Sequence, residues 1–332
     1  SATDFSRWAE PLKLVDVRLT KGERYPIRLE GQSGVAAAPA IFRKRVTDDL
    51  DRDLAAGVRD ADVIVAVMGL TSDLEGEEMP VKVEGFEGGD RTTLALPADQ
   101  IAFLEKAKAT GKPLILVMMN GSAIDLGWAK DNAAAILEAW YPGQSGGLAI
   151  ANVLSGKADP GGRLPLTFYH SVDDLPPFTD YSMEGRTYRY FRGAPVYPFG
   201  HGLSYTRFRY APLVVEPVDG AVEKGLRVTT RITNVGQRPG DEVAQLYITP
   251  PAFEGAPRTA LRGFQRLSLK AGESRAISFT LSPRDLSFVT MAGDRMLIPG
   301  DYDLSVGGGQ PGTQAPVERA RYTIGKAMPL PK

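Results

Sequence analysis

The sequence predicts a mixed α/β domain followed by an all-β domain, and three features of the chain indicate this division. From residue 47 continuous apolar runs alternate with amphipathic stretches, which is typical of a mostly parallel sheet covered by helices on both faces. From residue 208 short alternating strands are separated by turn residues, which favours a β-sandwich. The length of 332 residues also exceeds what one core usually organises. We expect three segments, at 1–46, 47–207 and 208–328.

The first segment, 1–46, reads as a short β region. It contains three β-like runs, at 15–19, 25–29 and 39–42. Three short strands bury too little apolar surface to be stable alone, so we expect them to complete a sheet that begins elsewhere.

The second segment alternates predicted helices and strands. Continuous apolar runs predict buried strands at 63–68, 113–119 and 135–140, with a further strand near 163–168. Apolar spacing predicts helices at 48–58, 97–110 and 147–154. Because ligands of such sheets bind beyond the carboxyl ends of the strands, we expect functional side chains there.

The remaining chain consists of a long loop and the sandwich. Residues 169–207 are rich in Pro, Asp, Tyr and Gly and are too long for a simple connector, so we expect this loop to be functional or packed on a neighbour. The clearest sandwich strands are predicted at 226–232, 243–248, 275–281 and 302–306.

Composition excludes several classes of function. With 39 basic and 40 acidic residues the net charge is -1, which argues against nucleic acid and anionic membranes as partners. The absence of cysteine removes disulfides, thiolate metal sites and cysteine nucleophiles. The histidines His170 and His201 have no carboxylate at ligand spacing, so we expect neither a metal site nor a cofactor. The start lacks both a signal-peptide pattern and a methionine, and we interpret the chain as a processed or excised piece of a longer one.

An acidic loop directly follows the predicted strand 63–68. It carries Asp73, Glu75, Glu77 and Glu78 and closes at 88–92. Carboxyl groups that leave the end of a buried strand are well placed for acid catalysis of hydrolysis, although in isolation such a cluster is more often a solvated loop.

Ordered motifs in this region resemble the C-terminal portion of the family 3 glycoside hydrolases, a group that includes β-glucosidases and β-xylosidases. The matching segments are 61–69, 89–91, 96–97, 119–122, 140–143, 146–147, 159–165, 186–190 and 197–205. The tail resembles the fibronectin-III-like module of many such enzymes at 233–236, 240–247, 261–264 and 299–302. Residues 1–46 are similar to the last strands of a PA14-like module that some members insert.

The resemblance implies an exo-acting, retaining glycosidase that acts on β-glucosides or β-xylosides and uses no cofactor. Such chemistry needs two carboxyl groups. In the family the nucleophile, an aspartate, lies in an N-terminal (β/α) barrel, which nothing here matches. This chain is therefore expected to supply the general acid/base, and its implied partners are the barrel segment and a β-glycoside oligosaccharide. Secretion or a periplasmic location also agrees with the resemblance.

The spacing leaves the identity of the acid open. Counting from the end of strand 63–68 selects Glu77, with Glu75 as the second choice. Compact relatives place the acid four residues before the Asp-Arg arginine, where Glu87 stands, but this loop is longer, and Glu78 also remains open. We prefer the count from the strand, because a strand fixes position and an inserted loop does not.

Two further residues are candidates for substrate binding. Arg91 either contacts sugar hydroxyls or positions the loop, and Asn120, at the end of strand 113–119, either approaches the sugar pocket or belongs to a tight turn.

Three hypotheses about function follow. The first hypothesis is the glycosidase half described above. The second is a non-catalytic carbohydrate-binding or scaffolding fragment. A third hypothesis is an independent hydrolase that uses Glu77 and Asp180. The sequence does not separate glucoside from xyloside specificity.

Overall fold

The computed structural model describes residues 49–76 and 78–331. Asp51–Lys332 form one compact unit. The strands predicted at 15–19, 25–29 and 39–42, and with them the PA14-like assignment, lie outside the described residues.

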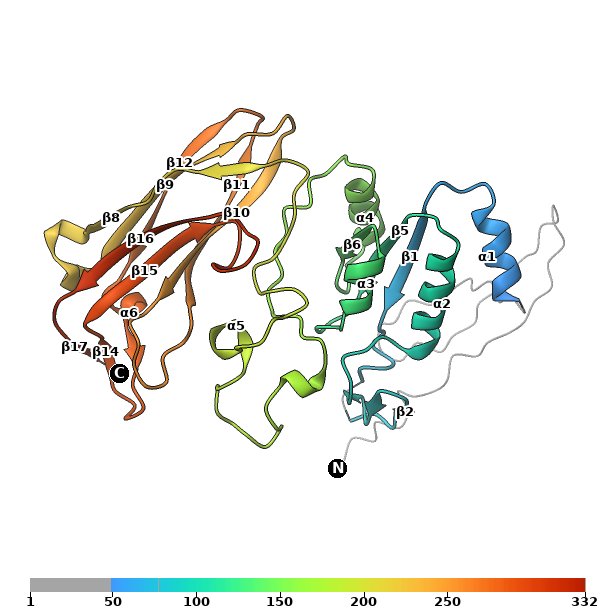
Figure 1. Cartoon of the computed structure of the whole chain (residues 1–332), viewed down its shortest axis with the longest axis horizontal. Helices are drawn as coiled ribbons and strands as arrows, with labels where there is room; N and C mark the ends of the chain where they lie inside the picture. The colour runs from blue at the N-terminus through green and yellow to red at the C-terminus, as the bar shows by residue number, and fades with distance from the viewer. Residues whose placement is uncertain (1–48, 77, 332) are drawn as a thin grey trace, which may run out of the picture. The chain divides into compact units, whose positions relative to one another are not determined.

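The α/β part is built on a parallel three-stranded sheet, as the apolar runs predicted. It has the order β1 (Ile64–Gly69), β5 (Leu114–Met119) and β6 (Ala135–Glu138), with β1 and β6 each paired to β5 (Figure 1). The third strand is shorter than predicted, because Trp140 adopts φ 55°, a left-handed conformation that a strand does not accommodate. All three strands run in the same direction, so their carboxyl ends meet at one edge of the sheet.

In the described chain four helices belong to this part of the fold, and Figure 1 shows them beside the sheet. Three of them were predicted and one was not, and in chain order they are α1 (Leu50–Val58), α2 (Ala98–Ala109), the unpredicted α3 (Gly127–Asn132) and α4 (Gly146–Leu154). Leu104 and Ala107 of α2 are buried with Leu114, Leu116 and Met118 of β5 in one core. The central strand β5 therefore anchors this part of the fold.

The central strand β5 is buried on both faces, as expected, since Leu116 and Val117 have no exposed surface, whereas Val65 and Val67 of the edge strand β1 are 46% and 56% exposed. One expectation for the α/β part was wrong. The predicted strand near 163–168 does not form: only an isolated bridge joins Phe168 to Tyr197. Pro165 lacks an N–H and cannot take part as a donor in a sheet ladder.

The acidic loop contains a small sheet of its own. Its strands are β2 (Lys82–Val83), β3 (Phe86–Glu87) and β4 (Asp90–Arg91), in the order β2-β3-β4. Phe86 is buried in the α/β core, so the far end of the loop is attached to the domain.

The sequence from Phe208 onward forms the predicted sandwich. One sheet has the order β11 (Ala260–Leu269), β10 (Gly240–Thr249), β15 (Gly300–Gly307) and β16 (Val317–Ile324). The other has the order β12 (Ser274–Leu281), β9 (Leu226–Asn234) and β7 (Phe208–Tyr210), with β8 (Val214–Pro217) also paired to β9. A smaller sheet joins β13 (Phe288–Val289), β14 (Arg295–Leu297) and β17 (Met328–Leu330), and the helix α6 (Pro283–Leu286) precedes it. Burial alternates along β9, as two-sheet packing requires.

The long loop expected to pack on a neighbour does contact the sandwich. It contains the short helices η2 (Val172–Asp174) and α5 (Thr187–Tyr190). The Tyr188 ring stacks on Phe199 at 4.3 Å, and its hydroxyl oxygen accepts a hydrogen bond from the Leu261 N. Gln245 of the sandwich in turn donates to the Gly200 carbonyl. Packing therefore accounts for these loop aromatics.

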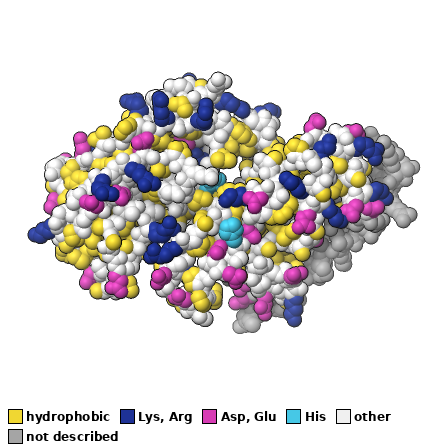
Figure 2. Space-filling view, in the orientation of Figure 1, with side chains coloured by type: hydrophobic (Ala, Val, Ile, Leu, Met, Phe, Trp, Pro, Cys, Tyr) yellow, Lys and Arg dark blue, Asp and Glu magenta, His cyan; other side chains and the backbone are white. Residues whose placement is uncertain are grey.

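Surface charges of both signs are interspersed on the face shown in Figure 2, in agreement with the net charge of -1. Within the described part of the chain, no helix has the length and apolar character needed to span a membrane.

Candidate active site

The acidic loop begins at a fixed point, the end of β1. The Gln100 side chain accepts a hydrogen bond from the Gly69 N at 2.9 Å and donates one to the Gly69 O at 2.8 Å. Gly69 has φ +142°, and a Cβ there would stand 1.8 Å from the Met119 O, so only glycine fits. The first residues of the loop therefore leave the sheet in a defined direction.

Glu75 joins the ends of the three strands. Its Oε1 accepts a hydrogen bond from Ser122 Oγ at 3.0 Å, and its Oε2 accepts one from the Tyr141 hydroxyl at 2.5 Å. Ser122 follows β5 and Tyr141 follows β6, so three separate segments meet at this carboxylate. Burial, and then the neighbouring Glu75, raise the pKa of Tyr141, which therefore remains a donor.

Arg91, at the closing end of the acidic loop, also contacts the turn after β5. Its Nη1 donates to Ser122 Oγ at 3.1 Å and to the Ala123 O at 2.7 Å. Burial lowers the pKa of Arg91, and nearby Glu75 opposes this shift. Its Nε and Nη2 are buried without a hydrogen-bond partner in the described structure. These contacts agree with the positioning role weighed for Arg91, and its sugar-binding role stays a prediction.

Asn120 is completely buried, with 0% of its surface exposed. Its Nδ2 donates to the Ser122 O at 2.8 Å, which closes the turn after β5. Its Oδ1 is buried and has no partner among the described residues. The contacts are those of a turn residue, and substrate binding by Asn120 stays a prediction.

The sequence reasoning missed Glu138, the last residue of β6. Burial raises the pKa of Glu138 to about 7, against the opposing hydrogen bonds from the Trp140 N and the Asn120 side chain. Its Oε1 accepts from the Trp140 N at 3.3 Å, whereas its Oε2 is buried without a partner in the described part of the chain. The available signal was a lone carboxylate inside the apolar run 135–140, followed by two aromatic residues.

The other acidic candidates are not brought into this cluster. Glu77, the preferred general acid, lies outside the described residues. Glu78 and Glu87 are exposed, the latter on β3. Asp180 is fully exposed on the long loop and accepts a hydrogen bond from the Ser182 N.

The cluster is equipped for carboxyl chemistry. Among the described residues no group of three or more His, Cys, Asp or Glu side chains is arranged to hold a metal ion. What the edge of the sheet offers is a carboxylate held by two hydroxyls, an arginine with free donors, and a second, buried carboxyl. Such a set is able to hold the acidic loop in place at this edge of the sheet and to offer donors to a polar substrate.

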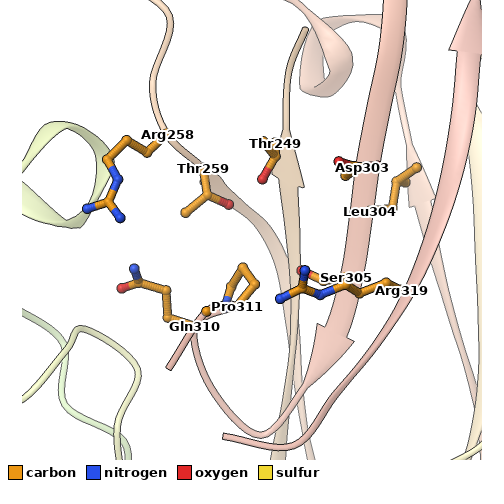
Figure 3. A pocket seen from close by; sticks show the side chains of 10 residues that line it. Thr249, Arg258, Thr259, Asp303, Leu304, Ser305, Gln310, Pro311 and Arg319 are labelled. Atoms are coloured by element: carbon orange, nitrogen blue, oxygen red, sulfur yellow. The ribbon is translucent and has the colours of Figure 1, made fainter. Parts of the chain in front are cut away.

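A separate pocket of about 230 Å³ lies on the sandwich (Figure 3). It opens between the ends of β10 and β11, the strands β15 and β16 and the loop that joins them, and Arg258, Gln310 and Arg319 contribute to its wall. Within the described structure neither arginine forms an ion pair, and the Gln310 Oε1 is buried without a partner. None of the residues at the carboxyl ends of the α/β strands, such as Glu75, Arg91 and Tyr141, lines this pocket.

Comparison with known protein families gives two matches. The glycosyl hydrolase family 3 C-terminal domain matches residues 11–205, and a fibronectin type III-like domain matches residues 242–310. The first match begins within the segment 1–46 that was assigned to a PA14-like module, and that assignment stays a prediction.

Individual proteins agree with these matches. A xylan 1,4-beta-xylosidase of Xylanibacter ruminicola is 41% identical over 304 residues, which cover 90% of this chain and 35% of that protein. A periplasmic beta-glucosidase of Salmonella typhimurium is 35% identical over 262 residues, or 75% of this chain and 33% of that protein. The chain thus spans about a third of the length of these curated relatives.

Solved structures give the same result. A β-glucosidase from Erythrobacter marinus has 33% identity and a TM-score of 0.69, covering 82% of this chain and 36% of that one. A β-glucosidase from Kluyveromyces marxianus in complex with glucose has 26% identity and a TM-score of 0.73, covering 87% of this chain and 35% of that one.

Proposed function

The chain belongs to glycoside hydrolase family 3, and from this premise we propose that it is the C-terminal part of a retaining exo-β-glycosidase that removes terminal glucosyl or xylosyl residues. The observation that carries the proposal is the acidic loop, which leaves the carboxyl end of β1 and is tied by Glu75 to the ends of β5 and β6. The relatives named as xylosidases and glucosidases support both sugars as substrates.

Retaining hydrolysis divides the reaction between two carboxyl groups about 5–5.5 Å apart. In the proposed enzyme an aspartate of the N-terminal barrel attacks the anomeric carbon, and the leaving oxygen takes a proton from a carboxylic acid of this chain. The resulting carboxylate then accepts a proton from water as the water attacks the glycosyl-enzyme. The chain contributes the general acid/base, and the barrel contributes the nucleophile and most of the sugar pocket.

Glu77 is the proposed general acid/base, and Glu75 is the alternative. Glu75 accepts hydrogen bonds from Ser122 and Tyr141, so both of its oxygens already have partners within the chain. A general acid must instead present a carboxyl oxygen to the leaving group. Glu75 therefore suits the role of a residue that fixes the loop, and we assign the role of the acid to Glu77.

The test uses the chain together with the upstream barrel segment and compares E77Q with E75Q. A general acid is needed less when the leaving group is a weak base. We therefore expect E77Q to lose most of its activity on alkyl β-glycosides, to keep much of it on dinitrophenyl β-glycosides, and to regain turnover with azide. We expect E75Q to lower all activities without azide rescue.

The opposite pattern in the two variants would assign the acid to Glu75. Comparing β-glucoside with β-xyloside substrates in the same assay ranks the two sugars. Hydrolysis by the chain without the barrel would refute the proposed division of the carboxyl groups.

The second candidate function, a carbohydrate-binding fragment, is favoured by the pocket on the sandwich. Arg258 and Arg319 supply two cations for a carboxylate, and Gln310 supplies an unsatisfied acceptor for a sugar hydroxyl. Asp303 in the same wall is paired with Arg321, so the set suits an acidic sugar. Titration calorimetry with glucuronic acid tests this function, with R319Q as the variant and R231Q, at an exposed arginine of the other sheet, as the control. Binding that R319Q abolishes and R231Q preserves would favour this function, and absence of heat with the wild-type chain would exclude this ligand.

A further inference from the structure

Glu138 is the last residue of β6, and Asn120 directly follows the neighbouring strand β5. In the parallel register Met118 of β5 pairs with Glu138 of β6, and Asn120 follows two residues later. The Asn120 side chain is within hydrogen-bonding reach of the Glu138 carboxyl. Each has one buried oxygen that lacks a partner among the described residues, Oε2 of Glu138 and Oδ1 of Asn120.

Both of these atoms are acceptors if Glu138 is ionised, so they do not bond to each other in that state. Buried polar atoms are nearly always paired, and an unpaired one costs about 1–3 kcal/mol. Turning the Asn120 amide over does not help, because its oxygen would then face the Ser122 carbonyl that Nδ2 now bonds. One added proton on the carboxyl satisfies both orphan atoms together.

The electrostatic surroundings agree with a protonated carboxyl. No charged side chain of the described structure contributes to the pKa of Glu138, which burial raises to about 7 against the opposing hydrogen bonds from the Trp140 N and the Asn120 side chain. The charged and titratable groups at this edge of the sheet are Glu75, Arg91 and Tyr141, and they interact with one another through direct contacts and through Ser122. The buried carboxyl is left without a cation.

We propose that Glu138 is a positioning residue whose protonated carboxyl donates a hydrogen bond to Asn120 Oδ1. The same carboxyl accepts the Trp140 N with its other oxygen, so it contacts both turns that leave the strand ends. One turn carries Ser122 and the other carries Tyr141, and these are the two hydroxyl partners of Glu75.

The second turn needs such support, because Trp140 has φ 55°. A left-handed backbone at a bulky residue is strained by about 1–3 kcal/mol and persists only where its surroundings enforce it. The hydrogen bond from the Trp140 N to Glu138, and the Trp140 ring against Phe168 at 6.2 Å, hold that conformation. Loss of the proton leaves the Glu138 carboxylate and Asn120 Oδ1 as two acceptors that cannot bond to each other. The two turns, and through them the acidic loop, are then held less firmly.

The first experiment measures the proton directly in this chain, independently of any activity. Carbon-13 NMR of glutamate-labelled protein should show a carboxyl that titrates near pH 7 and that E138Q removes, while any raised titration of Glu242, whose pKa burial also raises, should remain in E138Q. The control E105Q, at an exposed glutamate of α2, should leave it in place. A spectrum in which every glutamate titrates below about pH 5.5, or in which E138Q keeps the signal, would overturn the proposal.

The second experiment measures the consequence for turnover, and it rests on the proposed function. In the chain with its barrel, E138Q keeps a donor for Asn120, and we expect its kcat at pH 6 to stay within about threefold of wild type and its alkaline limb to move to higher pH. E138A removes the donor, and we expect kcat to fall about 10–100-fold with KM nearly unchanged, as for a misplaced catalytic group.

The outcomes separate the two proposals. If E138Q is as impaired as E138A, the neutral donor is not what matters and the positioning role is wrong. If the wild-type chain with its barrel shows no glycosidase activity, the proposed function fails, whereas the NMR titration still decides the protonation of Glu138.

Discussion

Within the described structure, Glu242 and the partly buried Glu138 have opposite surroundings. Glu242 of the sandwich accepts hydrogen bonds from Arg163 Nη2 at 2.9 Å and from the Tyr210 hydroxyl at 2.6 Å, so each of its oxygens is satisfied. Glu138 at the edge of the α/β sheet has one backbone bond of 3.3 Å and an oxygen without a partner in the described structure. Burial raises the pKa of both carboxyls, but only Glu242 has a cation that opposes the shift.

We therefore distinguish a structural ion pair, Arg163–Glu242, here called the joint, from a carboxyl that holds a proton, Glu138. Arg163 and Glu242 connect the segment after α4 to the sandwich, and nearby Asp159 accepts bonds from Ser204, from the Tyr205 N and from the Asp241 N. A joint of this kind is stable because every polar atom has a partner. At the edge of the α/β sheet several buried polar atoms have no hydrogen-bond partner in the described structure, which is typical of a site that binds a ligand or transfers a proton.

Breaking the joint should have the largest effect. R163M leaves the Glu242 carboxylate buried without its cation, and we expect the free energy of unfolding to fall by about 3–5 kcal/mol. Urea unfolding followed by circular dichroism measures this change. R231M, at an exposed arginine, should leave the midpoint unchanged, and an R163M midpoint equal to wild type would show that the ion pair is not a joint.

The next effect concerns the other glutamate and depends on pH. The folded pKa of Glu138 is about 7 and its ordinary value is 4.5, so the folded state binds the proton more tightly than the unfolded state does. Stability therefore falls as pH rises from 4.5 to 7. E138Q does not titrate and should exceed wild type by at most about 3 kcal/mol at pH 7.5, with no difference below pH 4.5.

Unfolding at a series of pH values checks this prediction. A difference between E138Q and wild type that does not change with pH would mean that Glu138 titrates normally. E105Q serves as the matched surface control.

We expect a smaller effect on stability at the contact between the turn after β5 and the turn after β6. A Cβ at Gly121 would stand 2.9 Å from the Tyr141 ring and 3.5 Å from Glu75 Oε2, so G121A should push the tyrosine away from the carboxylate. We expect a loss of about 1–2 kcal/mol of stability, the lower range for overpacking, because Tyr141 is 45% exposed and able to move. G57A, which meets no atom within 4 Å, is the control and should be neutral or stabilising.

The smallest effect should come from Y141F, which removes only the hydrogen bond to Glu75. We expect a change of about 1 kcal/mol in thermal unfolding, because the bond is half-exposed. Y181F, at a tyrosine that is 92% exposed, is the control. Equal midpoints for Y141F and wild type would mean that the loop is held by Ser122 and Arg91 alone.

The elements that the sequence predicted well are those with strong local signals. The apolar runs at 63–68 and 113–119 became β1 and β5, and the alternating run at 226–232 became part of β9. The strand near 163–168 failed because Pro165 removes a donor, and α3 was missed because it spans only Gly127–Asn132. Short elements carry too few residues for a periodicity to be read.

For the site, the sequence located the acidic loop but not the way it is held. Glu75 and Arg91 were singled out, and the structure places both at Ser122. Tyr141 and Glu138 were not proposed, because neither belongs to a motif with a catalytic pattern. Glu77 remains the predicted general acid.

By itself the sequence determined the two kinds of domain, the family motifs and the position of the acidic loop after an apolar strand, because these depend on local order along the chain. Only the tertiary structure decided that the turns after β5 and β6 supply the partners of Glu75. It also decided that Glu242 is paired while Glu138 is not. Hydrogen-bond partners and pKa values are set by burial and by neighbours that are distant in sequence, and residue order alone does not encode them locally.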